Sequence, residues 1–415
     1  MSSHPCLAKQ KKPSGSAVPP PRTEPDDTPP PTPPPPPVPP YRERWRRIAR
    51  ASRFPFAVYG AALLLHLVML AAMNPPGGPG IRDRLLSWDG QWFLDIARNG
   101  YPQEFSFTAD GLSGGPLAFF PAYPFLVRTV HTLTGLGYES AALVTSHVAL
   151  LAGLLCVHQL LLRLYDRRTA RITTVLVACA QPMALVFFMA YSESLFLALA
   201  AGALLALHRK AWLTAGVLTL FAGLTRPVAV ALIAALGVAV VLHLRRERRI
   251  TWRPPTALLL SYCGIPAYLG WVGLRTGQSD AWFKIQEAGW STRWDNGSAF
   301  TAFLVKTLSE GDGWVPVSTA LLILALVAAT VVAWSDEIWP PLMVYGTAVL
   351  ITTLGQSNYY HAKLRLLIPA LVFVIPVARA LARVRTRTAV ITLAVAALFG
   401  SWYGAYMLTV WGYAI

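Results

Sequence analysis

The chain has 415 residues, of which 54% are hydrophobic and only 13% are charged. Soluble domains average about 45–50% apolar and about 25% charged residues, so this composition excludes an ordinary soluble protein and favours one that crosses a membrane several times. The formal net charge of +16 does not indicate nucleic-acid binding, because the arginines gather at the ends of apolar runs, as on the cytoplasmic flanks of membrane helices.

Residues 1–40 are dominated by proline, with PPPTPPPPPVPP at 29–40. Proline lacks an amide donor and resists helix, so we predict a disordered or polyproline II tail on the cytoplasmic side. The tail has neither the apolar core nor the cleavage site of a signal peptide. A partner that docks proline-rich segments is a candidate for it, and a merely solvated tail is the simpler interpretation. Residues 41–415 are predicted to form one transmembrane domain.

Apolar runs of about 20 residues can span a bilayer. On this measure we predict an all-α polytopic membrane protein with about 11 transmembrane helices. The predicted crossings are 54–74, 139–164, 171–190, 192–207, 211–224, 226–244, 256–275, 317–334, 338–353, 364–384 and 388–411. The four cysteines lie in apolar spans or in the tail, so they indicate neither a disulfide framework nor a metal cluster.

Lysine and arginine in the short loops decide the predicted orientation. With a cytoplasmic N-terminus, the cytoplasmic loops are 165–171, 208–212, 245–253, 334–339 and 382–388, and four of these five are basic. The extracytoplasmic face then carries the large loop 75–138, the corners 190–194 and 224–227, the loop 276–316 and the segment 355–365. We therefore predict a multi-pass protein of the plasma membrane whose C-terminus is extracytoplasmic.

The segment SWDGQWFLDIARNGYP, 87–102, places acids among aromatic residues in the first external loop. A carboxylate such as Asp89 can accept a proton from a hydroxyl nucleophile. Trp88, Trp92 and Tyr101 can stack on a sugar, although aromatic residues also serve as interface anchors. Asp95 lies about 600° around a helix from Asp89, so the two carboxylates need not share a face.

Two later corners each carry one charged residue: the first an acid, Glu193, and the second a base, Arg226. In MAYSESLFLALA, Glu193 stands at the mouth of a crossing, where it can cap the following helix. In GLTRPVAVAL, Arg226 stands at a broken-helix junction and needs an anionic partner, either Glu193 or a substrate phosphate. The segment GPLAFFPAYPFLVRTV, 115–130, is predicted to be amphipathic or re-entrant rather than a full crossing.

The segment NYYHAKLRLLIPA, 358–370, presents His361, Lys363 and Arg365 at the external start of a crossing. The positive-inside rule places basic residues in cytoplasmic loops, whereas these potential cations lie on the predicted external face. Either an anionic ligand or contact with lipid headgroups explains them. Together with the acids, they describe one face that carries a carboxylate base, aromatic platforms and several cations.

Four segments in this order, SWDGQWFLDIARNGYP, LAFFPAYPFLVR, AYSESLFLAL and LTRP, resemble the PIG-V-type mannosyltransferases and their actinobacterial relatives. These are multi-spanning GT-C glycosyltransferases, and the likeness covers 87–230, with a looser echo at HAKLRLLIPALVF. The resemblance implies a GT-C-like bundle with a large first extracytoplasmic loop. It also implies a mannosyltransferase that uses a polyprenyl-phosphate mannose donor and an extracytoplasmic acceptor hydroxyl.

Asp89 matches the acidic residue that such enzymes carry in the first external loop, so the resemblance implies that it is the catalytic base and that the sugar carbon is inverted. The residues assigned to substrate binding are Trp88, Trp92, Asp95, Tyr101, Glu193, Arg226, His361, Lys363 and Arg365. No metal or other cofactor is required, since arginine can hold a single leaving phosphate. The arginine-, alanine- and proline-rich composition suggests a high-GC bacterium, so a glycolipid, a polysaccharide and a secreted protein are all candidate acceptors.

Two alternatives belong to other functional classes. A transporter or flippase for a lipid-linked sugar would want ionisable residues deep within the crossings and repeated halves. His66, His147 and His158 lie in or near spans, but no internal repeat is visible. A non-catalytic envelope scaffold, with the proline-rich tail as its docking arm, would have no need for Asp89.

Overall fold

The computed structural model describes residues 41–415 apart from 109–110, 248–250, 312, 337 and 415. The predicted tail, 1–40, lies outside the described residues. The chain divides into two units, Met1–Arg47 and Ile48–Ile415. The helical bundle that carries the candidate site belongs to the second unit.

Long apolar helices make up most of the bundle. In the described part of the chain, six helices are long and apolar enough to cross a membrane. They are α1 (Tyr41–Met73), α5 (Tyr138–Leu164), α9 (Val230–Glu247), α10 (Arg253–Thr276), α13 (Trp314–Ser335) and α17 (Thr386–Thr409). Three shorter apolar helices, α7 (Glu193–His208), α8 (Trp212–Gly223) and α14 (Pro340–Leu354), pack among them. The chain is therefore an all-α, multi-pass membrane protein, as predicted.

The predicted count of eleven crossings is not confirmed: six of them are single helices of sufficient length, three are the shorter helices α7, α8 and α14, and two are broken. Residues 171–190 form α6 (Arg167–Val175), a π-helical turn (Leu176–Ala180) and a 3-10 turn (Ala184–Phe188). Residues 364–384 form a pair of helical pieces, Tyr360–Leu367 and Leu371–Arg383, bent by 84°. Pro182 and Pro369 stand at the breaks, where a missing amide donor interrupts the helical ladder.

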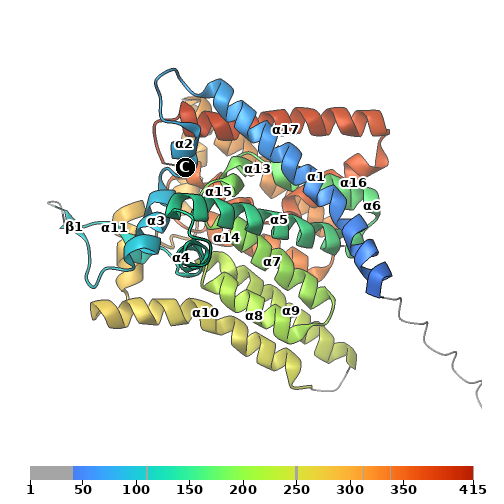
Figure 1. Cartoon of the computed structure of the whole chain (residues 1–415), viewed down its shortest axis with the longest axis horizontal. Helices are drawn as coiled ribbons and strands as arrows, with labels where there is room; N and C mark the ends of the chain where they lie inside the picture. Colours follow the sequence, from blue (N-terminus) through green and yellow to red (C-terminus); the bar gives the residue numbers. More distant parts are fainter. Residues whose placement is uncertain (1–40, 109–110, 248–250, 312, 337, 415) are drawn as a thin grey trace, which may run out of the picture. The chain divides into compact units, whose positions relative to one another are not determined.

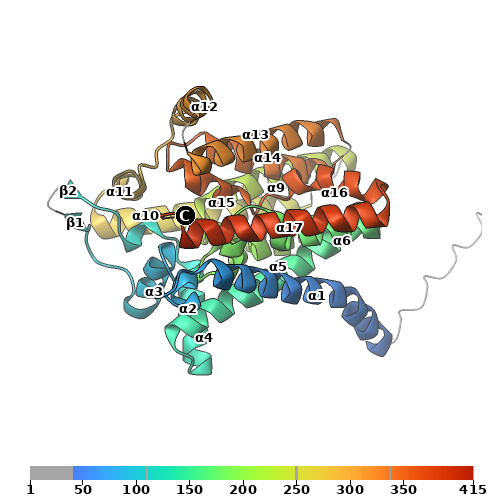
Figure 2. The same cartoon turned by 90° about the horizontal axis from the view of Figure 1, so that it is seen from above.

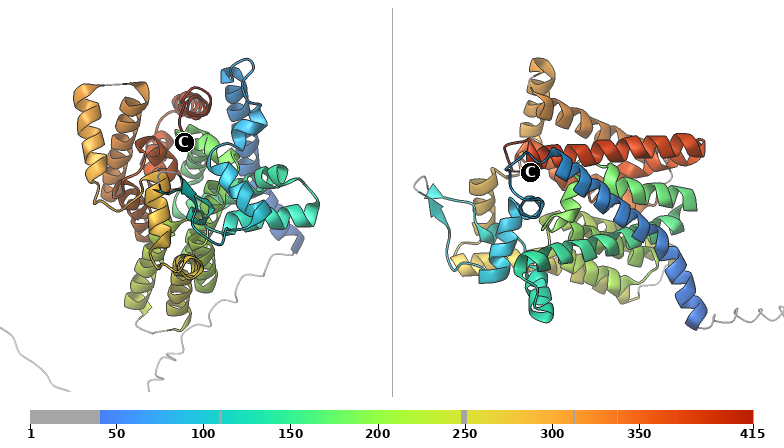
Figure 3. Two further views of the ribbon diagram at one scale, coloured as in Figure 1. Left: turned by 90° about the vertical axis from the view of Figure 1, so that its left-hand side faces the viewer. Right: turned by 45° about the horizontal axis from the view of Figure 1, so that its top comes forward.

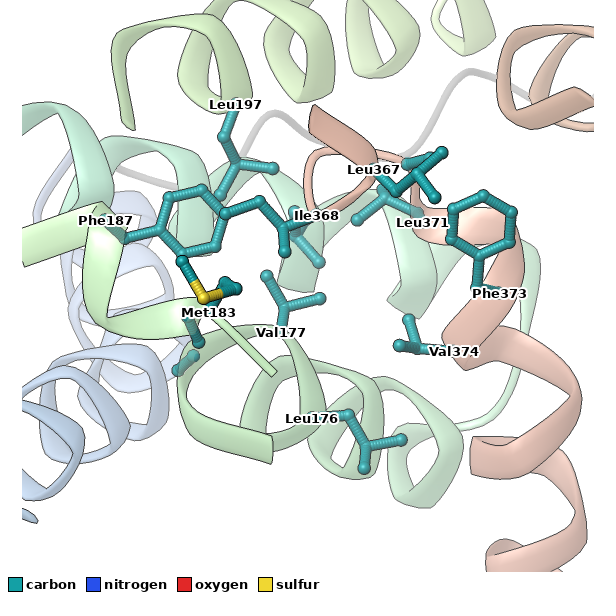
Figure 4. Close-up of a cluster of buried hydrophobic side chains, with 14 of the residues drawn as sticks. Leu176, Val177, Met183, Phe187, Leu197, Leu367, Ile368, Leu371, Phe373 and Val374 are labelled. Atoms are coloured by element: carbon teal, nitrogen blue, oxygen red, sulfur yellow. The ribbon is translucent and has the colours of Figure 1, made fainter. Parts of the chain in front are cut away.

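The two broken segments contribute side chains to one buried apolar cluster (Figure 4). Leu176, Val177, Met183 and Phe187 from the first segment belong to the same buried cluster as Leu367, Ile368 and Leu371 from the second segment. The Gln181 amide also donates to the Ile368 carbonyl at 3.3 Å. Irregular backbone within a membrane is tolerated where protein surrounds it, and these residues are almost fully buried.

The predicted external loops contain regular structure of their own. Between α1 and α5 lie α2 (Ile81–Leu85), α3 (Asp89–Asn99), the strand pair β1 (Phe107–Thr108) and β2 (Gly111–Leu112), the 3-10 turn η1 (Pro116–Ala118) and α4 (Ala122–Thr134). The two strands pair antiparallel, with Phe107 opposite Leu112. The segment 276–316 contains α11 (Ala281–Trp290) and α12 (Ser298–Glu310).

These elements gather at one end of the bundle, together with the C-terminus (Figures 1 and 2). The connections from α5 to α6 and from α16 (Val374–Arg383) to α17 lie at the opposite end. In the right-hand view of Figure 3, the axis of α12 runs across the axis of α17. The segments that the sequence assigns to opposite sides of the membrane are thus separated by the length of the bundle.

The segment 115–130 is short and helical rather than a crossing. Its helix α4 has 13 residues, and Arg128 on it donates from Nε to the Ala97 carbonyl at 2.7 Å and from Nη2 to the Arg98 carbonyl at 3.1 Å. These carbonyls belong to the last turn of α3, where backbone acceptors lack partners within the helix. Arg128 therefore anchors α3 to α4.

The basic connections predict which end of the bundle faces the cytoplasm. In a variant whose four native cysteines are replaced, a cysteine at the exposed position Glu104 should react with a membrane-impermeant thiol reagent in intact cells. A cysteine at the exposed position Thr388 should react only after the cells are opened. The reverse pattern of labelling would overturn the predicted orientation.

Candidate functional site

Four charged side chains from separate segments meet at the end of the bundle that carries α2, α3, α4 and α11. Asp89 is the first residue of α3 and Glu193 is the first residue of α7. Arg226 precedes the 3-10 turn η4 (Pro227–Ala229), and Arg365 lies in α15 (Lys363–Leu367). Asp89 and Arg365 are 276 positions apart in the sequence, so only the tertiary fold brings them together.

The four side chains form a continuous ion-pair network, the charged quartet. Arg365 Nη1 donates to Asp89 Oδ2 at 2.5 Å, and Arg365 Nε lies 3.6 Å from Glu193 Oε1. Arg226 Nη1 lies 2.6 Å from the same Glu193 oxygen. Glu193 therefore bridges the two arginines, and Arg365 in turn connects Glu193 with Asp89.

The charged quartet is largely shielded from solvent. The exposed fractions of the side chains are 14% for Asp89, 1% for Glu193, 15% for Arg226 and 10% for Arg365. Two carboxylates and two guanidinium groups balance in charge, which is how buried charges are tolerated. Glu193 Oε2 has no hydrogen-bond partner among the described residues. The quartet is consequently sensitive to the loss of any one member.

Backbone hydrogen bonds dock the segment between α1 and α5 onto the two chain turns that carry Glu193 and Arg226. The Ala190 amide donates to the Leu85 carbonyl, and the Ala122 amide donates to the Leu224 carbonyl, each at 2.9 Å. The first bond ties α2 to the corner that precedes Glu193. The second ties the start of α4 to the corner that precedes Arg226.

Local backbone geometry places the Asp89 carboxylate at the start of α3. Trp88 has a positive φ of 57°, a conformation that non-glycine residues rarely adopt and that is often found at functional sites. The Asp89 amide donates to Tyr191 Oη at 3.1 Å. The Tyr191 ring lies 5.2 Å from the Arg365 guanidinium, so this tyrosine contacts both members of the Asp89–Arg365 pair.

The charged quartet lines a cavity of about 390 Å³. Aromatic and amide side chains from other segments complete its wall. They include Phe119, Trp282, Gln286, Trp290, Trp294, Asn358 and Tyr359. Small-molecule sites typically combine an apolar, aromatic wall with a few convergent polar groups, and this cavity has that composition.

The structure places four of the predicted site residues, Asp89, Glu193, Arg226 and Arg365, in the cavity wall. It places His361 and Lys363 outside the cavity lining. Lys363 Nζ donates to the carbonyls of Thr353 at 3.1 Å and Gln356 at 2.8 Å, and His361 stacks on Tyr359. Residues two apart on a helix point in different directions, which separates Lys363 from Arg365.

The remaining predicted residues support the loop from outside the cavity lining. Trp88 is 39% exposed, and Trp92 stacks on Phe119 with a centroid distance of 6.2 Å. Asp95 accepts a hydrogen bond from Asn99 Nδ2 at 2.7 Å. Asp89 and Asp95 therefore face different surroundings, which their spacing along the helix allowed.

Tyr101 packs in an aromatic cluster with Tyr268 and Trp271. Its hydroxyl donates to the Phe119 carbonyl at 2.8 Å. Burial raises the pKa of Tyr101 above its ordinary value, so the hydroxyl stays protonated and continues to donate. Its role is to hold the loop next to the cavity.

Sequence reasoning missed the wall that α11 and the residues after it contribute. The stretch AWFKIQEAGWSTRW, 281–294, contains three tryptophans within fourteen residues, and that density was the available signal. It also missed Tyr191, whose contacts with Asp89 and Arg365 depend on folding. For Tyr191 the sequence offered no such signal.

The chain is similar to known proteins in its fold and, over one segment, in its sequence. ArnT from Cupriavidus metallidurans, bound to undecaprenyl phosphate, aligns over 82% of this chain and 62% of its own chain, with 17% identity and a TM-score of 0.50. At this identity the likeness concerns the fold. GPI mannosyltransferase 2 of Drosophila melanogaster is 34% identical over 122 residues, and that of Drosophila pseudoobscura pseudoobscura is 31% identical over the same length. The chain spans about a quarter of the length of these curated relatives.

The fold defines a multi-spanning membrane protein whose helices are arranged as in ArnT. Within this class, residues 80–247 match the family model described as mannosyltransferase (PIG-V). The resemblance predicted from the sequence is therefore confirmed over this segment, which carries Asp89, Glu193 and Arg226. Arg365 and the α11 wall lie outside it.

The buried position of Glu193 predicts a large effect on stability. Glu193→Ala leaves two guanidinium groups next to each other without their shared carboxylate. Removing one partner of a buried ion pair lowers the free energy of unfolding by about 3–5 kcal/mol. We expect a marked fall in the thermal unfolding temperature of the purified protein. Glu247→Ala is the matched control, because it removes the exposed ion pair with Lys210, which is worth about 0–1 kcal/mol. Equal stability of the two variants would contradict the bridging role of Glu193.

Proposed function

We propose that the chain is an integral membrane glycosyltransferase that transfers mannose from a polyprenyl-phosphate donor to an acceptor hydroxyl, with inversion at the sugar carbon. The observation that carries the proposal is the convergence of Asp89, Arg226 and Arg365 on one cavity. A carboxylate base and two guanidinium groups are the groups that this reaction requires. The family match over 80–247 supports mannose as the sugar.

Asp89 is the proposed catalytic base. Its Oδ2 accepts from Arg365, and its Oδ1 has no partner among the described residues. In the proposed step, Asp89 takes the proton of the acceptor hydroxyl while the acceptor oxygen attacks the sugar carbon. The bond from that carbon to the phosphate oxygen breaks on the opposite face, and the polyprenyl phosphate leaves with the electron pair. Asp89 then holds the proton.

Arg226 and Arg365 are the proposed phosphate-binding residues. A guanidinium group has five N–H donors in a planar fork that matches phosphate oxygens, and the pairs with Asp89 and Glu193 use only some of them. The leaving phosphate gains negative charge as the bond breaks, so donors already in place stabilise it most at the transition state. Glu193 positions both arginines for this task. The reaction as drawn uses no metal ion or other cofactor, because two fixed positive charges face a single phosphate.

We infer that the end of the bundle with the cavity faces the extracytoplasmic side of the plasma membrane. The basic connections at the opposite end support a cytoplasmic placement of that end. In this orientation the N-terminal residues 1–40 form a cytoplasmic tail ahead of the domain 41–415, and the C-terminus is extracytoplasmic. The acceptor is then a glycolipid, a polysaccharide or a protein outside the cytoplasm.

A transporter or flippase for a lipid-linked sugar is less well supported. The charged quartet lies at one end of the bundle rather than along a path through it. The histidines within the spans have local partners: His66 Nε2 lies 3.3 Å from the Ala178 carbonyl, His147 Nδ1 lies 2.7 Å from Tyr59 Oη, and His158 Nδ1 lies 3.0 Å from Thr174 Oγ1. Such contacts suit structural histidines. A non-catalytic scaffold would have no use for the buried charged quartet.

The proposed base predicts the effect of Asp89→Asn. This substitution keeps the size of the side chain but removes the charge that takes the acceptor proton, and general-base catalysis contributes about 10²–10⁴-fold. We expect sugar transfer to fall by that factor in purified protein supplied with polyprenyl-phosphate mannose and membrane acceptors. Binding of the donor should be retained, since Arg365 loses a competing anion.

Asp95→Asn is the matched control in the same helix, because among the described residues the Asp95 carboxylate accepts a side-chain hydrogen bond only from Asn99 and lies outside the cavity lining. We expect at most a mild loss of transfer. Wild-type turnover in Asp89→Asn would remove Asp89 as the base. If transfer were unaffected in both variants and in Glu193→Gln, the site would not be catalytic.

A further inference from the structure

Helix α11 forms a wall of the cavity that lies outside the family match over 80–247. Two hydrogen bonds fix this helix to η1: Trp282 Nε1 and Gln286 Nε2 donate to the Ala118 carbonyl at 3.1 and 3.0 Å. The helix ends at Trp290, whose side chain lines the cavity. The position of Trp290 therefore depends on how α11 is held.

A contact between two glycines fixes the C-terminal end of α11. A Cβ atom on Gly289 would lie 2.6 Å from Gly114 Cα, and a Cβ atom on Gly114 would lie 2.7 Å from Gly289 Cα and 3.0 Å from the Trp290 ring. No Cβ fits at such distances, because the opposing atoms are backbone and cannot turn away. The two backbones thus touch directly, and this contact joins the first external loop to α11.

The contact seats Trp290 at the end of a series of aromatic rings. Trp290 meets Phe119 edge to face with a centroid distance of 5.3 Å, and Phe119 stacks on Trp92 at 6.2 Å. Phe119 also lines the cavity. The indole therefore packs against Phe119 and is held by the backbone contact at the preceding residue, Gly289, which makes it a rigid flat surface in the cavity lining.

We propose that Trp290 is the platform on which the pyranose ring of the donor sugar stacks, and that Gly114 and Gly289 are the positioning residues that hold it there. This inference rests on the proposed function. The sugar is bonded to the phosphate, so a phosphate on Arg226 and Arg365 brings the ring into the same cavity of about 390 Å³. Asn358 also lines this cavity, and its Oδ1 has no partner among the described residues, so it can accept a hydrogen bond from a sugar hydroxyl.

The test compares two lipids that differ only in the sugar. Binding of polyprenyl-phosphate mannose and of polyprenyl phosphate is measured on the purified full chain. Trp290→Ala should bind polyprenyl-phosphate mannose about tenfold more weakly, as expected for the loss of an aromatic stacking surface. It should bind polyprenyl phosphate as tightly as the unchanged protein, and Trp290→Phe should recover part of the lost affinity.

Gly289→Ala and Gly114→Ala test the positioning role. Each should shift the affinity for the mannose lipid in the direction of Trp290→Ala while leaving polyprenyl phosphate unaffected. Gly270→Ala is the matched control, because a Cβ there meets nothing within 4 Å. Alanine favours a helix over glycine, so a loss in Gly289→Ala cannot come from weaker helix propensity.

Equal binding of the mannose lipid by Trp290→Ala and by the unchanged protein would overturn the inference and leave the proposed function standing. Equal weakening of both lipids would also overturn it, since that result indicates general damage to the site. If the unchanged protein bound neither lipid, the proposed function would fail first, and the inference would fall with it.

Discussion

The site depends on one buried carboxylate, that of Glu193, which bridges two arginines from distant segments. Buried arginines are costly unless an anion balances them, so Arg226 and Arg365 can lie side by side only because Glu193 lies between them. The same bridge orients Arg365 toward Asp89. Removing any member leaves an unbalanced charge in a largely apolar surrounding.

The two broken helices bring Glu193 and Arg365 to the cavity. An unbroken crossing over 364–384 would carry Arg365 along a straight helix, whereas the bend of 84° ends the first piece next to the cavity. The irregular segment that ends at Phe188 likewise leads into Tyr191 and Glu193. Where a helix ends, its charged side chains and free backbone groups become available for a ligand. Tight apolar packing between the two broken segments stabilises the irregular backbone.

The long helices and the chemical character of the site were predictable from the sequence. Apolar length predicted the spans of α1, α5, α9, α10, α13 and α17, and the ordered segments over 87–230 predicted the family resemblance that the match over 80–247 confirms. Asp89, Glu193, Arg226 and Arg365 were singled out as charged residues in unusual positions. Trp92 and Tyr101 lie outside the cavity lining, and the sequence could not show this, because it does not distinguish an aromatic residue that lines a cavity from one that supports its wall.

The sequence by itself determined the membrane-spanning class, the excess of basic residues on one set of loops, and the set of charged residues from which the site is built. These properties are local, because each depends on the composition of a stretch of about 20 residues. Tertiary structure alone decided which of those residues meet. Lys363 and Arg365 are two positions apart, yet helical geometry turns one toward backbone carbonyls and the other toward Asp89. The α11 wall depends on a contact between Gly114 and Gly289, and because glycine has no side chain, such backbone proximity leaves no pattern in the sequence to read.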